Sequence, residues 1–280
     1  MLRASSNGDR RSEALSTRAS LIESFERGVL TLTLNRPERR NALDGDMSRR
    51  LLRALLDVEV RTEVRCVVIT GVGSAFCAGD DIGSLDDFLL SGDDTNVPAF
   101  PGTQDAYYLR IVEAVVACRA PVIAAINGSA AGAGTELACA ADIRIASDAA
   151  RIGSCLVNVA QVGNAVMLPR VVGLARATEI YMTGRLVEAD EALRIGLVHH
   201  VVPAKAFGHE VDLLAAELAS RPTQAIALFK ALRERAFGQP VELGLRLQDA
   251  FHQRNHREVA DEAEGLRAFV EKRPPRFEGR

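Results

Sequence analysis

Two glycine-bearing segments of this 280-residue sequence combine residue types that could stabilise a developing negative charge. The first covers residues 73–82 and contains Gly79, and the second covers residues 127–137 and contains Gly132 and Gly134. Glycine lets the backbone adopt unusual dihedral angles and lets a ligand approach the main chain closely. We expect the second segment to run into a helix, whose first N–H groups have no intrahelical partner and lie at the positive end of the helix dipole.

Glu136 adds a proton-transfer group to the second segment, three residues beyond Ala133 and about one turn into the expected helix. Two N–H groups that converge on one oxygen form an oxyanion hole, which contributes roughly 3–4 kcal/mol per donor to catalysis. A thioester enolate suits such a site because its charge appears on the carbonyl oxygen as the reaction proceeds. A general base must lie within reach of the proton that it moves, and Glu136 could reach the carbons beside that carbonyl. A turn rich in Gly and Ala also serves tight packing, so the arrangement alone leaves both interpretations open.

Predicted strands precede both segments and must position them. Residues 29–34 alternate apolar and polar side chains, as a half-buried strand does, and residues 66–70 and 121–126 are short apolar runs typical of strands buried on both faces. Helical spacing marks residues 47–56, with Asp44 or Asp46 available as a cap, and further helices are expected at 108–116, 130–140 and 204–270. We expect the last of these to break near 221–222 and 238–240. This alternation predicts an α/β fold.

Composition excludes several classes of partner. Net charge is −3 and no apolar stretch reaches the roughly 20 residues of a membrane helix, so we expect a soluble protein that binds neither nucleic acid nor membrane. Five cysteines without a C-x-x-C pair indicate free thiols in a reducing cytoplasm rather than disulfides or a metal site. We expect a disordered tail over residues 1–19, an α/β core over 20–203 and a helical region over 204–280.

An ordered series of motifs resembles the enoyl-CoA hydratase/isomerase (crotonase) superfamily and covers about residues 20–270. In chain order the motifs are residues 35–37, 41–43, 75–81, 121–128, 132–137, Asp142, 168–170, 183–185 and 189–201. The resemblance implies a spiral of repeated β-β-α units with a C-terminal helical oligomerisation region. It also implies acyl-coenzyme A thioesters as substrates with no further cofactor and no metal, and trimers that pair into hexamers. By the same resemblance the backbone N–H groups of Asp80 and Ala133 would form the oxyanion hole, and Glu136 would be the catalytic glutamate.

The sequence departs from the family pattern at the second acid. Hydratases that resemble this chain carry a glutamate where Leu156 stands here, and the following loop, residues 160–165, is about three residues shorter. Some isomerases of the family use an aspartate in that loop, where this chain offers only Gln161 and Asn164. Leucine cannot activate water or donate a proton, so the usual two-carboxylate hydration mechanism is in doubt.

Further residues are candidates for contact with the ligand. Arg39 and Arg40 follow the first strand, where the resemblance places the coenzyme A entrance, and they could pair with phosphates or be solvated surface charges. Lys230 and Phe251 in the late helices could touch the ligand of this or a neighbouring subunit. The full set of predicted ligand contacts is Arg39, Arg40, Ala42, Ala78, Gly79, Gly132, Leu156, Lys230 and Phe251.

Three other features favour structural roles. Cys77 lies in the first segment, but no histidine is near it in sequence to activate a nucleophile. His199 and His200 have no further ligand at metal spacing. Ser129 lacks the G-x-S-x-G elbow of a serine hydrolase.

Three functions remain open, and the first is favoured. An isomerase would move a double bond in an enoyl-CoA with Glu136 as its one carboxylate. An enoyl-CoA hydratase would use Glu136 alone to position water. A binding protein would hold acyl-CoA without turning it over.

Overall fold

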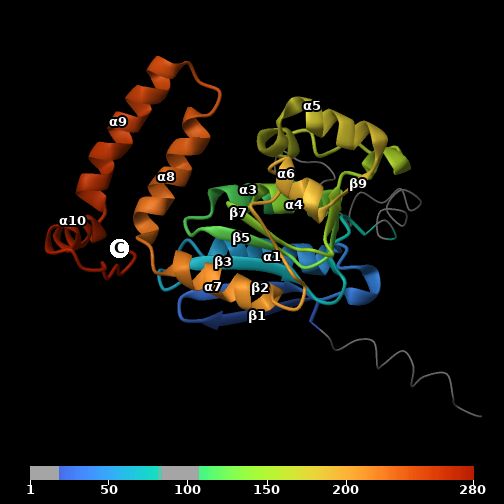
Figure 1. Ribbon diagram of the computed structural model, residues 1–280, viewed down its shortest axis with the longest axis horizontal. Coiled ribbons are helices and arrows are strands. Elements are labelled where there is room, and N and C mark those ends of the chain that lie inside the picture. The colour runs from blue at the N-terminus through green and yellow to red at the C-terminus, as the bar shows by residue number, and fades with distance from the viewer. Residues whose placement is uncertain (1–18, 82, 84–106) are drawn as a thin grey trace, which may run out of the picture.

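The structure of the protein, a computed structural model, describes residues 19–81, 83 and 107–280 (Figure 1). Within these residues the larger sheet has six strands, in which β1 is antiparallel to β2 and the other neighbours are parallel. Their order is β1 (Leu21–Glu26), β2 (Val29–Leu34), β3 (Cys66–Gly71), β5 (Val122–Ile126), β7 (Ile143–Ser147) and β10 (His200–Val202). The tail predicted for residues 1–19 lies outside the described residues, apart from Ala19.

A smaller sheet includes two short strands that lie within the two glycine-bearing segments. Its described strands lie in the order β4 (Ala75–Cys77), β6 (Ser129–Ala131), β8 (Arg151–Gly153) and β9 (Leu186–Glu188). Strands β4 and β6 are parallel neighbours, with Ala75 opposite Ser129 and Cys77 opposite Ala130. Because the carboxyl ends of parallel strands meet at one edge of a sheet, the chain after Cys77 and the chain after Ala131 emerge side by side.

Two asparagines, the buried Asn41 and the partly buried Asn127, shape the turn between β3 and β4. The Nδ2 atom of Asn41 donates to the carbonyl oxygens of Val72 and Ala75 at 3.0 and 2.7 Å. The Nδ2 atom of Asn127 donates to Gly73 O at 2.9 Å from the neighbouring turn. These bonds supply donors to backbone carbonyl groups in the turn. The Asn-Ala-Leu motif at 41–43 and the Asn-Gly motif at 127–128 therefore have structural roles here.

Helices cover both faces of the larger sheet. On one face lie α1 (Gly45–Asp57), α3 (Tyr107–Ala117) and α4 (Ala133–Ala140), with α5 (Met167–Thr183) beyond α4, and on the other lies α7 (Phe207–Ala219) (Figure 1). Strand β3 shows why its apolar run is continuous: Val67 and Ile69 pack into the first layer, and Cys66 and Val68 pack against α7. Short elements complete the body: 3-10 helices at Pro37–Arg39 (η2) and Leu156–Val159 (η3), and α6 (Ala189–Arg194).

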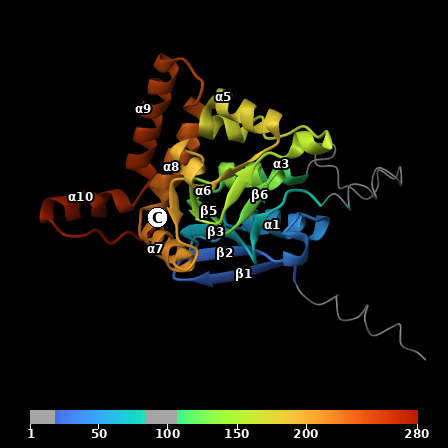
Figure 2. The same cartoon turned by 45° about the vertical axis from the view of Figure 1, so that its right-hand side comes forward.

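The last helices form an arm. Helices α8 (Thr223–Ala236) and α9 (Val241–Glu258) pack against each other and rise from the body, and α10 (Asp261–Glu271) extends sideways from their base (Figure 2). The breaks fall at the predicted Arg221–Pro222 and Gly238–Pro240 positions, where proline cannot continue a helix. A further break at Val259 and Ala260, ahead of α10, was not predicted.

Most predicted elements are confirmed, and one boundary is corrected. The helix expected from residue 130 begins at Ala133, because Ser129–Ala131 form β6 and Gly132 turns the chain with a φ of 53°. Asp44 caps α1, since its Oδ1 accepts from Met47 N at 2.8 Å. Among the described residues, no helix is long and apolar enough to cross a membrane.

Candidate active site

Close backbone packing brings the two glycine-bearing segments together. A Cβ atom on Gly79, whose φ is 102°, would lie 3.0 Å from Ala131 O and 3.3 Å from Ala133 N. A Cβ atom on Gly134 would lie only 2.2 Å from Cys77 O. Side chains at these positions would push the start of α4 away from the chain after β4. Glycine is therefore required for the contact that places residues 79–80 beside Ala133.

The segment around Asp80 is anchored on its other side by Leu43. Leu43 N donates to Gly79 O at 2.8 Å and Asp81 N donates to Leu43 O at 3.0 Å. Since successive N–H groups of extended chain point in opposite directions, the Asp80 amide faces away from Leu43. The Asp81 carboxylate binds Arg36 at 2.8 Å, and Arg36 also binds Asp44 at 3.1 Å. Arg36 thus fixes this segment to the start of α1, a role that sequence reasoning missed.

Hydrogen bonds to the carbonyl oxygen fix the Gly132–Ala133 peptide group at the start of α4. Gly132 O accepts hydrogen bonds from Thr135 N at 3.0 Å, Glu136 N at 3.1 Å and Asn164 Nδ2 at 2.9 Å. The Ala133 N–H belongs to the same peptide group and points in the opposite direction. Among the residues that the structure describes, it has no hydrogen-bond acceptor. This amide has the geometry expected of an oxyanion donor.

Glu136 lies one turn further along α4 and its carboxylate is almost fully buried, with the residue 2% exposed. Oε1 accepts from Met167 N at 3.0 Å, and Oε2 accepts from Asn164 Nδ2 at 2.8 Å. Met167 is the first residue of α5, which is kinked at Gly173 with a φ of 78°, so the carboxylate lies at the N-terminus of its short first segment. Both oxygens are oriented by donors, and α4 carries the carboxylate and the Ala133 amide together.

Leu156 lies beside the start of α4, as the sequence suggested. Its Cδ2 would be 3.3 Å from a Cβ on Gly132, and its Cδ1 would be 2.7 Å from a Cβ on Gly163. Its methyl groups therefore fill the space between these two glycines. Asn158, an alternative polar group on η3, donates instead to Gly184 O at 3.0 Å.

The other predicted contacts near the site come from the chain before α1. Ala78 N donates to Arg40 O at 3.0 Å, so residues 39–42 border the Gly79 segment, and Ala42 is buried there. The Arg39 and Arg40 side chains are exposed, and neither guanidinium forms an ion pair with a described residue.

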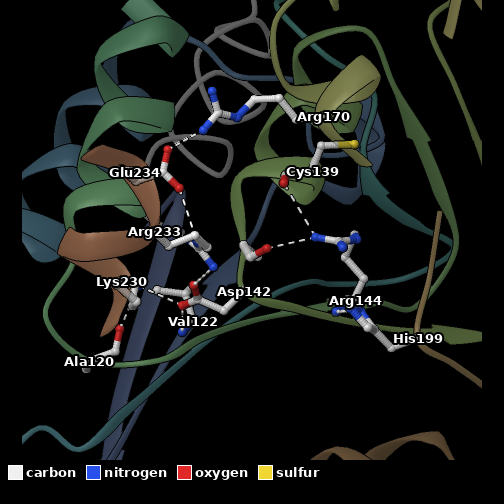
Figure 3. Close-up of polar contacts among 11 residues, drawn as sticks. Ala120, Val122, Cys139, Asp142, Arg144, Arg170, His199, Lys230, Arg233 and Glu234 are labelled. Carbon is white, nitrogen blue, oxygen red and sulfur yellow. Dashed lines mark hydrogen bonds and ion pairs between the residues drawn. The ribbon is translucent and has the colours of Figure 1, made fainter. Parts of the chain in front are cut away.

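Lys230 and Phe251 lie elsewhere. The buried Lys230 ammonium binds Asp142 Oδ2 at 2.6 Å and Ala120 O at 3.1 Å (Figure 3). Asp142 also binds Arg233, and Arg233 contacts Glu234, which reaches Arg170 on α5 (Figure 3). Lys230 therefore attaches the arm to the body.

Phe251 is buried between the Arg235 and Arg254 guanidinium groups, 5.3 and 5.2 Å from its ring centroid. Its place is inside the α8–α9 pair. Within this single chain, neither Lys230 nor Phe251 is brought to the Glu136 site.

The features assigned structural roles fit that assignment. Cys77 is fully buried, and desolvation raises the pKa of its thiol to about 12, which makes a thiolate nucleophile unavailable near neutral pH. His199 Nδ1 accepts from Arg144 N at 3.1 Å, and burial together with the nearby Arg144 charge lowers its pKa. Across the described part of the chain, no cluster of three His, Cys, Asp or Glu could hold a metal ion.

Comparison with known proteins defines the class. A model of the enoyl-CoA hydratase/isomerase family matches residues 24–280. The chain is 38% identical over 256 residues to a probable enoyl-CoA hydratase of Rhodobacter capsulatus, covering 90% of this chain and 95% of the relative. It is 35% identical over 269 residues to the 1,2-epoxyphenylacetyl-CoA isomerase of Escherichia coli, covering 93% and 98%.

Solved structures agree with this match. The enoyl-CoA hydratase from Bacillus anthracis superposes with a TM-score of 0.83 at 30% identity, covering 93% of this chain and 100% of that one. The chain therefore belongs to the enoyl-CoA hydratase/isomerase family of enzymes. The crotonase-type fold predicted from the sequence is confirmed.

Proposed function

We propose that the protein isomerises the double bond of an enoyl-CoA thioester, with Glu136 as its one acid/base group. The observation that carries the proposal is a single buried carboxylate one turn beyond the Ala133 amide, with the methyl groups of Leu156 beside Gly132. Moving a double bond requires one proton to leave and one to return. A second carboxylate is not needed for this reaction.

The proposed reaction converts a 3-enoyl-CoA into a 2-enoyl-CoA. The Glu136 carboxylate removes a proton from carbon 2, and the electron pair spreads over carbons 2 to 4 and the thioester carbonyl. The carbonyl oxygen, now negatively charged, accepts hydrogen bonds from the Asp80 and Ala133 amides. Glu136 then returns the proton to carbon 4, leaving the double bond between carbons 2 and 3.

Coenzyme A would bind across the entrance beside residues 39–42. The exposed Arg39 and Arg40 guanidinium groups suit phosphate oxygens, while Ala42, Ala78, Gly79 and Gly132 are small residues that allow a thioester close to the backbone. No cofactor is required, because the reaction is a proton transfer within the substrate.

Hydration is the second candidate. The relative from Rhodobacter capsulatus carries a hydratase name, as does the Bacillus anthracis structure. Hydration needs water to be oriented and deprotonated while a proton is supplied, and one positioned acid or base contributes roughly 10²–10⁴-fold to the rate. Leu156 supplies neither function, which favours isomerisation.

One experiment separates the candidates. The protein is incubated with 2-enoyl-, 3-enoyl- and saturated acyl-CoAs, and product mass and binding are followed. Isomerisation gives a new double-bond position at unchanged mass, and hydration adds the mass of one water. Binding of all three without conversion would indicate an acyl-CoA-binding protein and would refute both enzymatic proposals.

We further propose that the protein is a cytoplasmic homotrimer or hexamer. The division into a tail (1–19), a core (20–203) and a helical region (204–280) belongs to this proposal. Support comes from apolar side chains exposed on the arm, which include Phe237, Val241, Leu245, Leu266, Phe269 and Val270. Apolar faces of this kind are normally buried against another surface.

A further inference from the structure

The Asn164 side chain lies at the centre of a buried hydrogen-bond cluster beside Glu136. Its Nδ2 donates to Glu136 Oε2 at 2.8 Å and to Gly132 O at 2.9 Å. Its Oδ1 accepts from Ser154 Oγ at 2.8 Å. Asn164 is 4% exposed and Ser154 is fully buried, so water does not compete for these bonds.

The orientation of the Asn164 amide is determined by its partners. Glu136 Oε2 and Gly132 O are both acceptors, so only an NH₂ group can bridge them. Turning the amide over would direct Oδ1 at two other oxygens, while the Ser154 hydroxyl could adapt to either orientation. The Asn164 NH₂ group therefore donates to Glu136 and Gly132, and its oxygen points toward Ser154.

The bond to Gly132 O also acts on the proposed oxyanion donor. Gly132 O and the Ala133 N–H belong to one trans peptide group, so fixing the oxygen fixes the direction of the N–H. A hydrogen bond accepted at the oxygen polarises the same peptide group and strengthens its N–H as a donor. One side chain thus contacts the base and the peptide that carries the oxyanion amide.

Backbone conformation supports this placement. Asn164 has a φ of 55°, in the left-handed region that asparagine and glycine tolerate better than other residues. Glycine at this position would accept the same backbone and remove only the side chain. Asn164→Gly is therefore the cleanest deletion.

We propose that Asn164 is a positioning residue that orients the Glu136 carboxylate and the Ala133 amide together. The proposal rests on the proposed function, because it requires Glu136 as base and Ala133 as oxyanion donor. It assigns to Asn164 a hydrogen-bonding role that packing alone would not require.

The kinetic test uses two variants and a matched control. Asn164→Gly should lower kcat on a 3-enoyl-CoA by roughly 10–100-fold, as for other residues that orient a reacting group, with KM changed by less than about threefold. Asn164→Asp keeps the shape but turns an acceptor toward Glu136, so it should lose at least as much. Asn158→Ala, which removes an amide directed at Gly184, should keep kcat within about twofold.

Full activity of Asn164→Gly or of Asn164→Asp would overturn the proposal.

A second readout does not depend on turnover. The carbonyl stretching frequency of a saturated acyl-CoA bound to the protein reports hydrogen bonds to the thioester oxygen. The natural protein should lower this frequency relative to that of the free ligand. Asn164→Gly should lower the frequency by a smaller amount. No shift in the natural protein would contradict the proposed oxyanion site, whereas an equal shift in both proteins would contradict the role of Asn164 alone.

Discussion

Glu136 and Leu156 define the chemistry at the scale of single residues. The carboxylate is oriented by Met167 N and Asn164, and Leu156 presents methyl groups beside Gly132. In the proposed reaction, an apolar side chain at this place excludes water from one side of the substrate. The pair would therefore favour a proton shift within the bound molecule over addition of water.

Leu156→Glu tests this directly. The new carboxyl group could orient water, so hydration of crotonyl-CoA should rise by roughly 10²-fold or more above that of the natural protein, in line with the contribution of a positioned acid or base. The rate of 3-hydroxyacyl-CoA formation measures the change. Leu156→Gln, which has similar size without an acid, serves as the control. Brisk hydration by the natural protein would show that another group replaces the second acid.

Cysteine reactivity gives a second prediction at this scale. Burial raises the pKa of Cys77 to about 12, so the thiol stays protonated and inert at neutral pH. Iodoacetamide at pH 8 should leave Cys77 unmodified in the native protein and react first at Cys155, the one cysteine that is not buried. Peptide mass mapping provides the measurement. Rapid alkylation of Cys77 with loss of activity would reopen the nucleophile interpretation.

The sequence alone identified some of these residues and missed the role of another. Glu136 and Leu156 were identified because each lies at a recognisable place in a motif. Asn164 was identified only as a residue available in the loop where some isomerases carry an aspartate, since its bonds to Glu136 and Gly132 span 28 and 32 residues. A glycine followed by an asparagine indicates a left-handed turn, but no local pattern reveals a partner so distant in sequence.

At the scale of elements, ion pairs fix the arm to the body. Asp142 follows α4 and accepts from Lys230, Arg233 and Val122 N, and the chain of contacts continues through Glu234 to α5. The Lys230 and Asp142 side chains are only 4% and 13% exposed. The network therefore links the arm to the same helix whose first amide binds Glu136.

Asp142→Ala should destabilise the fold strongly. It leaves the Lys230 ammonium buried without a counter-charge, which costs roughly 3–5 kcal/mol. Denaturant unfolding measures the loss. Arg246→Ala, which breaks an exposed pair with Glu242 on α9, should cost less than about 1 kcal/mol. Equal effects of the two variants would show that the buried network does not hold the arm.

The helices and strands predicted most accurately are those marked by a pattern of residues that are close in sequence. The apolar runs of β3 and β5, the cap of α1 and the proline breaks in the arm all follow from short-range chemistry. Strands β4, β6, β8 and β9 were missed as strands, because three residues are too few to show alternation. Those short strands nevertheless place the two glycine-bearing segments side by side.

At the scale of the whole molecule, most of the exposed large apolar side chains of the last helices lie on α8 to α10, although Leu213 of α7 is also 53% exposed. Leu214 and Leu218 of α7 pack on the sheet of their own chain. By contrast Leu245 on α9 is 60% exposed and Phe269 on α10 is 84% exposed. We therefore propose α8 to α10 as the main surface for assembly.

We expect a trimer or hexamer held by this surface. Light scattering at low micromolar concentration should give a mass three or six times that of the 30.1 kDa chain. Phe269→Asp should shift the protein toward smaller species, because a charge at a buried apolar contact leaves an unpaired group. A species of chain mass for the natural protein would refute the assembly.

Conversion of a 3-enoyl-CoA by the natural protein and by Glu136→Gln tests the central claim most directly. Formation of the conjugated 2-enoyl thioester at unchanged mass measures isomerisation, and titration with a saturated acyl-CoA measures affinity. We predict that the natural protein makes the 2-enoyl product and that the variant does not. Its affinity should stay within about tenfold, or 1.4 kcal/mol, because binding rests on coenzyme A contacts and backbone amides. Unchanged turnover in Glu136→Gln would contradict the account and point to a base elsewhere in the protein.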